Sequence, residues 1–348
     1  MIDRASFSKE HILRIKGTSK RDPGLIERVI FAFGLLEAIK RTDMPLIFKG
    51  GTSLMLLTDS PKRFSTDIDI IVAPDTPLDS YLEKAAAFWP FVRIEEQERH
   101  KISGINKRHF KFIYNSPLRE SEFHIILDVL FENNLYPSLV PKNIQNDLLI
   151  TKEPYVQVDI PNANGLSGDK LTAFAPHTTG IKYNIDKELE IIKQLYDIAA
   201  LIPYINNFQE VKDTFMAIVR AEIGYRGLSI DPTDVLKDTI DTAMCVAGKG
   251  LVRSEEYHQL SKGIKNISNH IYSEKFNQDS ATKCACAVMV LAAAILTKQA
   301  ELPQLKTLDS YSETSIKNPA YSKLKYIKKL DIHSYAYLIE TLAMLDSL

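Results

Sequence analysis

Two segments of the sequence carry residue types that bind phosphate and divalent metal ions. The first follows a short apolar run and consists of Gly50, Gly51, Thr52 and Ser53. Glycines let a backbone approach a phosphate closely, and the amides at the start of a helix favour an anion. The second contains Asp67 and Asp69, which project from one face if DIDIIV forms a strand. Such paired carboxylates suit Mg²⁺, which keeps phosphate oxygens among its ligands.

A third carboxylate often completes the two metal sites of phosphoryl-transfer enzymes. Asp128 is the best candidate, because it lies in the middle of the apolar run 123–131. An ionised group among such neighbours is costly unless it is paired or binds a metal. The alternative for Asp128 is a solvent-facing or salt-bridged residue at the sheet surface. For Asp67 and Asp69 it is a strand-end pair that makes turn hydrogen bonds, and for residues 50–53 it is merely a tight strand–helix turn.

The elements that must position these residues follow from the hydrophobic pattern. Helices are predicted at 23–41, 52–57 and 77–88, and strands at 46–48, 67–72, 91–96, 110–114 and 123–131. From residue 166 the period becomes helical, with helices at 166–174 and 186–202 and helical periodicity over most of 207–348. We therefore predict an α+β fold in which a mixed α/β half precedes an all-helical half.

The same residues resemble a known signature. Residues 48–71 read FKGGTSLMLLTDSPKRFSTDIDII and resemble the DNA polymerase β-like nucleotidyltransferase superfamily. More narrowly, KGGTSL followed by RxSxDID resembles the AbiEii/AbiGii family, which includes type IV toxin–antitoxin and abortive-infection toxins and the MenT-like nucleotidyltransferases. GDKLTAF at 168–174 is similar to the family's helix with an active-site lysine, here Lys170. QLYDIA at 194–199 is similar to its segment with a further acidic residue, here Asp197.

The resemblance implies a domain organisation and an activity. Residues 1–165 would form the nucleotidyltransferase domain with a mixed catalytic sheet, and residues 166–348 a helical domain whose first helices complete the active site. The enzyme would transfer a nucleoside monophosphate from an NTP to a hydroxyl of tRNA. Two Mg²⁺ ions would serve as its cofactor. It would act in the cytoplasm, without a membrane, as the toxin of a toxin–antitoxin or phage-defence pair with a cognate antitoxin.

The resemblance also assigns roles to single residues. Asp67 and Asp69 would bind the metal, and Asp128 would bind it or accept the proton of the attacking hydroxyl. Residues 50–53 would bind the triphosphate, and Arg63 and Ser65 would touch the leaving pyrophosphate. Lys170 would contact a phosphate, and Asp197 would orient Lys170 or the acceptor. The alternatives are surface loop residues for Arg63 and Ser65, a solvated lysine at a helix start, and a buried capping or salt-bridging Asp. Two departures from the family pattern concern nucleotide contacts. The basic residue before QLYDIA is displaced to Lys193. The Arg that usually follows Lys170 is absent, and His177 or Lys182 could substitute for it.

Charge bears on the acceptor. The chain of 348 residues has 43 Lys and Arg against 44 Asp and Glu, which argues against a protein that coats nucleic acid. Two stretches are nevertheless locally basic, namely Arg99, His100, Lys101, Lys107, Arg108, His109 and Lys111, and then Lys317, Lys323, Lys325, Lys328 and Lys329 with Tyr321 and Tyr326. Lysines neutralise phosphates and tyrosines can stack on bases, which favours an RNA acceptor. A solvated face with tyrosines on the core side is the alternative for each stretch alone.

Other chemistries lack their signatures. The Cys, at 245, 284 and 286, have no zinc spacing and are expected to be buried free thiols in a reducing cytosol. The longest apolar run, Ala285 to Leu296, is shorter than the about 18 residues of a membrane span. Two other functions stay open: nucleotidylation of a protein side chain by the same site, and a regulatory protein that binds NTP without turnover.

Overall fold

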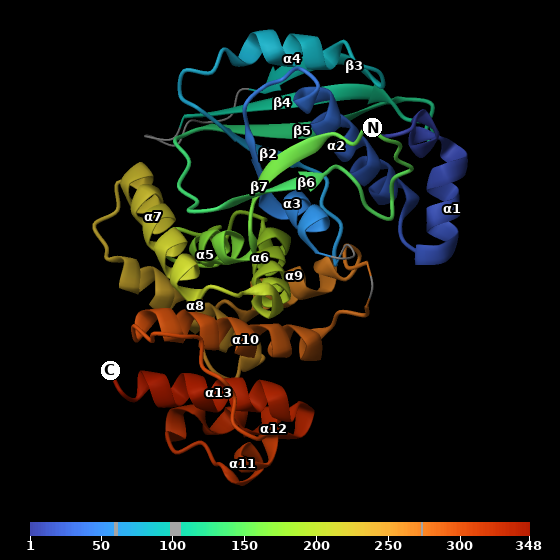
Figure 1. Ribbon diagram of the computed structural model, residues 1–348. Helices are drawn as coiled ribbons and strands as arrows, with labels where there is room; N and C mark the ends of the chain where they lie inside the picture. Colours follow the sequence, from blue (N-terminus) through green and yellow to red (C-terminus); the bar gives the residue numbers. More distant parts are fainter. Residues whose placement is uncertain (59–61, 98–105, 273) are drawn as a thin grey trace. The chain divides into compact units, whose positions relative to one another are not determined.

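The computed structural model describes the chain except residues 59–61, 98–105 and 273 (Figure 1). The described residues form two compact units. Unit 1 comprises Met1–Asn162 and Asn269–Glu274, and unit 2 comprises Ala163–Ser268 and Lys275–Leu348. A short segment from late in the sequence therefore belongs to the N-terminal unit.

Unit 1 is built on a mixed sheet, which has seven strands in the described part of the chain, in the order β3-β4-β5-β2-β1-β7-β6. The strands are β1 (Ile47–Lys49), β2 (Ile68–Val72), β3 (Phe91–Gln97), β4 (Lys107–Asn115), β5 (Glu122–Phe131), β6 (Leu139–Asn143) and β7 (Gln157–Pro161). The β2–β5 and β1–β7 pairs are parallel, and the other neighbouring pairs are antiparallel. The described helices of this unit are α1 (Lys9–Ser19), α2 (Pro23–Lys40), α3 (Gly50–Leu57) and α4 (Leu78–Ala86). The predicted α+β fold with a mixed sheet is confirmed.

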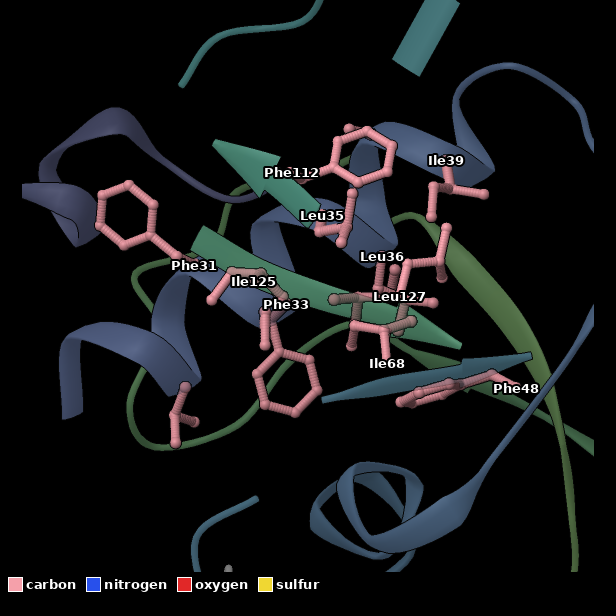
Figure 2. Close-up of a cluster of buried hydrophobic side chains, with 14 of the residues drawn as sticks. Phe31, Phe33, Leu35, Leu36, Ile39, Phe48, Ile68, Phe112, Ile125 and Leu127 are labelled. Atoms are coloured by element: carbon pink, nitrogen blue, oxygen red, sulfur yellow. The ribbon is translucent and has the colours of Figure 1, made fainter. Parts of the chain in front are cut away.

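Helix α2 forms the centre of the unit 1 core. Asp22 caps it by accepting the Leu25 amide, and Pro23 occupies the first turn, where its missing N–H costs nothing. The sequence predicted an amphipathic helix here. Nearly all residues of α2 are buried instead, so the helix has no solvent-facing side of the predicted kind. Figure 2 shows Phe31, Phe33 and Leu36 of α2 among apolar side chains of the sheet. These sheet residues include Phe48, Ile68, Phe112, Ile125 and Leu127.

Strand alternation sends the remaining side chains to the opposite face. Ile68 and Ile70 of β2 are buried in the core, so Asp69 between them leaves the sheet on the other side. Leu127 and Val129 of β5 place Asp128 on that same polar face. The apolar packing of one face thus determines the direction of the candidate metal ligands.

Unit 2 is helical in its described residues. Its helices are α5 (Ala163–Ala173), α6 (Glu188–Leu201), α7 (Phe208–Arg226), α8 (Pro232–Ala247), α9 (Tyr257–Ile267), α10 (Gln278–Leu296), α11 (Leu308–Glu313), α12 (Ile327–Leu330) and α13 (Ile332–Leu345). Helix α10 lies at the centre and packs against α6, α8 and α13 (Figure 1). The predicted all-helical C-terminal half is confirmed.

Helix α10 is longer than the apolar run suggested. Among the described residues it alone is long and apolar enough to cross a membrane by length and composition, but 72% of its apolar window is buried inside the protein. The packing of α10 against three neighbouring helices makes it a core helix of unit 2. The cysteines are free, with Cys245 and Cys286 buried and Cys284 half-buried.

Candidate active site

A row of polar residues crosses the centre of the polar face. In the sheet register Lys49 pairs with Asp69, Asp69 with Asp128, and Asp128 with His109. Residues in register on neighbouring strands project from the same face with their Cβ atoms about 5 Å apart. Asp69 and Asp128, which are 59 positions apart in the sequence, are therefore neighbours. The structure brings these two predicted metal ligands together.

The turn from β1 into α3 packs directly against the Asp69 carboxylate. Gly50 has a φ of +78°, which side-chain-bearing residues rarely adopt. A Cβ added there would lie 2.1 Å from Oδ2 of Asp69, so only glycine leaves room for this approach. Helix α3 begins at Gly50, two residues earlier than predicted, and without a side-chain N-cap. The uncapped first turn and the carboxylate of a candidate metal ligand are thus side by side.

Thr52 and Ser53 hold this turn together through their hydroxyl groups. Thr52 Oγ1 donates to the Asp67 carbonyl at 2.6 Å, and Ser53 Oγ donates to the Gly50 carbonyl at 2.8 Å. Both side chains are buried. The Thr52 bond ties α3 to the start of β2. Because each hydroxyl donates its one proton to the backbone, the donors that suit a phosphate here are the amides of the first helical turn.

Arg63 and Ser65 pack against the second glycine of the turn. A Cβ added to Gly51 would lie 2.5 Å from an Arg63 guanidinium nitrogen and 2.9 Å from Ser65 Oγ. The Arg63 side chain is buried, and it donates to the Phe64 carbonyl at 3.1 Å. Arg63 and Ser65 are thus next to the predicted phosphate-binding turn rather than dispersed on a surface loop.

The short segment Asn269–Glu274 supports the Arg63 loop, a contact that no sequence pattern indicated. The Phe64 amide donates to the His270 carbonyl at 2.7 Å, and the Tyr272 amide donates to the Lys62 carbonyl at 3.0 Å. The Phe64 and Tyr272 rings meet edge to face at 5.2 Å between centroids. Residues more than 200 positions later in the sequence thus brace the loop that leads into β2.

The predicted set of three carboxylates is only partly assembled. Asp67 precedes β2 by one residue, because the strand begins at Ile68, and its side chain is exposed. In the described part of the chain no group of three or more His, Cys, Asp or Glu side chains is arranged to hold a metal ion. Asp69 and Asp128 fit a hard divalent ion nevertheless, because Mg²⁺ is commonly held by one or two carboxylates together with substrate phosphates. The packing of Gly50 on Asp69 is the observation that favours such a shared site.

In unit 2, Lys170 of α5 and Asp197 of α6 form an ion pair. Lys170 Nζ lies 2.8 Å from Asp197 Oδ2, and their side chains are 6% and 1% exposed. Lys170 Nζ also donates to Oε1 of Gln194 at 3.2 Å. The lysine is therefore buried and paired, not solvated, and the contact expected between it and Asp197 is present.

The displaced Lys193 and the suggested substitute His177 have other partners, whereas the second suggested substitute, Lys182, is exposed. Lys193 pairs with Glu190 at 2.8 Å on α6. The His177 ring nitrogen Nε2 lies 3.2 Å from Glu256, and the His177 amide donates to Asp238 at 2.8 Å. In this geometry His177 serves to anchor the segment after α5.

The basic stretch around β4 is divided between the two faces of the sheet. Arg108 pairs with Glu96 and Asp79 at 2.7 and 2.8 Å on the core side. Lys107 and Lys111 alternate with it and lie on the face of Asp128. Arg99, His100 and Lys101 lie outside the described residues. His109 donates toward Asp128 instead of lining a separate basic patch.

Of the two tyrosines in the lysine-rich stretch of unit 2, Tyr321 is half-buried and Tyr326 is turned inward. Tyr326 donates its hydroxyl to the Ala247 carbonyl at 2.6 Å and is half-buried. Lys328 lies over the Tyr335 ring, whereas Lys317, Lys323, Lys325 and Lys329 are exposed. Tyr326 thus takes the core-facing role.

Comparison with known proteins identifies the family. The sequence profile described as nucleotidyl transferase AbiEii toxin, type IV TA system, matches residues 35–266, more than half of the chain. The chain belongs to the AbiEii family. It is therefore a nucleotidyltransferase of a toxin family, as the resemblance predicted.

Solved structures and curated proteins add little to this AbiEii assignment. JHP933 from Helicobacter pylori matches with a TM-score of 0.42 and 14% identity, over 78% of this chain and 93% of that chain. A candidate nucleotidyltransferase from H. pylori matches with a TM-score of 0.43 and 13% identity, over 80% of this chain and 99% of that chain. No curated protein matches the sequence.

Proposed function

We propose that this AbiEii protein is a Mg²⁺-dependent enzyme that transfers a nucleoside monophosphate from an NTP to a hydroxyl of RNA, with tRNA as the acceptor. One observation carries the proposal. The glycine turn at the start of α3 packs on the Asp69 carboxylate, and Asp69 is in register with Asp128. A phosphate at the turn and a cation on the carboxylates would then be in contact.

The reaction forms one bond and breaks another. The acceptor hydroxyl oxygen bonds to the α-phosphorus and gives up its proton to solvent water. The bond between this phosphorus and the α–β bridging oxygen breaks, and pyrophosphate leaves with the electron pair. A bound divalent ion would neutralise phosphate charge during this exchange. In the proposal Asp69 and Asp128 would hold that ion together with phosphate oxygens, and the exposed Asp67, just before β2, would serve a second ion.

Further residues complete the proposed substrate site. The α3 amides of residues 50–53 would bind the triphosphate, because the positive end of a helix favours an anion. Arg63 and Ser65 would meet the leaving pyrophosphate, and their packing against Gly51 supports this role. We also propose that Lys170 contacts a phosphate and that Asp197 orients it. The sequence resemblance and the buried Lys170–Asp197 ion pair in unit 2 support these two roles.

Positively charged side chains near Asp128 support RNA as the proposed acceptor. Lys107 and Lys111 lie on the same face of the sheet as Asp128, and lysines placed there suit the phosphates of an RNA end. Because the family is a type IV toxin family, we also propose a cognate antitoxin and a cytoplasmic site of action, where NTPs and tRNA are present.

The test incubates the purified protein with total tRNA, Mg²⁺ and each NTP labelled at the α-phosphate. We expect label that ribonuclease removes and protease does not, and we expect Asp67→Ala and Asp69→Asn to abolish it. Asp159→Asn is the matched control, because Asp159 is exposed on the same face of the sheet at β7. It should leave labelling intact.

Other outcomes of this test would refute parts of the proposal. Label that resists ribonuclease but not protease would identify a protein acceptor. NTP binding without pyrophosphate release would identify a regulatory protein. Labelling that persists in Asp69→Asn would refute the metal assignment.

A further inference from the structure

His109 makes a direct side-chain contact with a candidate metal ligand. Its Nδ1 lies 2.7 Å from Oδ1 of Asp128, and the two side chains are 16% and 30% exposed. From its sequence, His109 was predicted only as part of a basic stretch for the acceptor. The contact instead links it to the carboxylate that stands beside Asp69.

The sheet fixes this pairing from both strands. His109 of β4 is in register with Asp128 of β5, and Phe110, Leu127 and Val129 next to them in sequence are buried in the core on the opposite face. A slip of one residue in either strand would bury the polar side chains and expose Phe110 or Leu127. The apolar face therefore holds the imidazole and the carboxylate side by side without help from a substrate.

The direction of the hydrogen bond follows from the chemistry of the groups. An ionised carboxylate only accepts, so Nδ1 of His109 carries the proton and donates it. The terminal torsion of an aspartate is otherwise broad, and the bond to His109 restricts it. An oriented carboxylate loses less rotational freedom when a cation binds than a freely rotating one does.

We propose that His109 is a positioning residue, which holds the Asp128 carboxylate in the orientation that binds the divalent cation. This inference rests on the proposed function, because it takes Asp128 as a ligand of the catalytic ion. Groups that orient metal ligands in this way typically contribute 10- to 100-fold to metal affinity or activity.

Three substitutions of His109 test whether the hydrogen bond that it donates to Asp128 matters, or only the space that its side chain fills. In His109→Asn the amide nitrogen occupies about the place of Nδ1 and can still donate. In His109→Gln the amide lies farther out, near the place of Nε2, and in His109→Ala no donor remains. His124→Ala is the matched control, because His124 lies on the same face of β5 four residues before Asp128 and is in register with Ile113, not with His109.

The first readout is binding of Mn²⁺ alone to the nucleotide-free protein, followed by electron paramagnetic resonance. We expect His109→Ala and His109→Gln to weaken Mn²⁺ binding by about 10- to 100-fold, and His109→Asn and His124→Ala to stay within about threefold of the unchanged protein. The inference is overturned if His109→Ala binds Mn²⁺ as tightly as the unchanged protein, if His109→Asn fails like His109→Ala, or if the unchanged protein binds no Mn²⁺.

The second readout is the Mg²⁺ dependence of nucleotide transfer. A positioning role predicts that His109→Ala needs more Mg²⁺ for half-maximal turnover and recovers most of its turnover at saturating Mg²⁺. Loss of turnover at every Mg²⁺ concentration would contradict it. A failure of the unchanged protein to transfer any nucleotide would instead refute the proposed function, and the Mn²⁺ measurement would still decide the role of His109.

Discussion

The buried ion pair between Lys170 and Asp197 allows a structural role and a catalytic role to be separated. The perturbations are Lys170→Met, Asp197→Leu and the double substitution. Each single change leaves the other charged group in a site where the side chains are 6% and 1% exposed. The double change replaces both charges by apolar side chains and leaves neither charge unpaired.

The expected magnitudes follow from this burial. Removal of one partner of a buried pair costs about 3–5 kcal/mol of unfolding free energy, because the remaining charge stays buried without the opposite charge of the pair. Replacement of both partners by apolar residues is often neutral or stabilising. We therefore expect each single variant to lose about 3–5 kcal/mol and the double variant to lie within about 1 kcal/mol of the unchanged protein.

Urea unfolding measures these differences, and Lys237→Met is the matched control. Lys237 pairs with Asp234 on α8, where the side chains are 58% and 42% exposed. Loss of an exposed pair of this kind costs only about 0.2–1 kcal/mol. A single variant of the buried pair that behaves like Lys237→Met would refute the assignment of a buried, charged pair.

Nucleotide transfer by the folded double variant then tests the proposed role of Lys170. If the ammonium group contacts a phosphate, the double variant is stable and inactive. If Lys170 serves only to pair with Asp197, the double variant is stable and active. The second result would refute the phosphate contact while leaving the structural role intact.

Two further predictions concern backbone geometry and pH. Gly50→Ala should lower nucleotide transfer by more than about 100-fold, because the new Cβ would meet Asp69 Oδ2. Gly227 also has a positive φ but has open space around it. Gly227→Ala should therefore cost only about 1–2 kcal/mol of stability and no activity. Equal loss of activity in both variants would contradict the close-contact explanation. Burial raises the pKa of Asp238 above 3.8, so the folded protein holds this proton more tightly than the unfolded chain, and stability falls as pH rises through the folded pKa. Asp238→Asn should remove this fall in stability, which is at most about 1.4 kcal/mol per pH unit. The measurement is urea unfolding at several pH values. If Asp238→Asn leaves the pH dependence of the unfolding free energy unchanged, the prediction is wrong.

Local patterns predicted the elements that position the candidate site. The apolar run of α2 and the alternation of β2 and β5 are properties of short windows, and their ends agree with the structure within one or two residues. Strands β6 and β7 and helix α1 were missed. Strand β6 contains Pro141 and polar residues, and β7 has only Val158 and Ile160 as core residues, so neither short window stands out from a loop.

Contacts between distant segments were beyond prediction from periodicity. Alternation indicates that Asp69 and Asp128 leave the core, but only the strand order makes them neighbours, and only the register of β4 on β5 brings His109 to Asp128. The pairing of Asn269–Glu274 with the Arg63 loop depends on the same kind of long-range contact. The closeness of Lys170 and Asp197 was anticipated through family resemblance, not through spacing.

The most direct test of the central claim is a comparison of NTP labelled at the α-phosphate with NTP labelled at the γ-phosphate, in the same reaction with tRNA and Mg²⁺. Nucleotidyl transfer predicts that the α-label enters RNA while the γ-label is released as pyrophosphate, one for each nucleotide added. Entry of the γ-label into RNA, or release of pyrophosphate without incorporation of the α-label into any acceptor, would contradict the account.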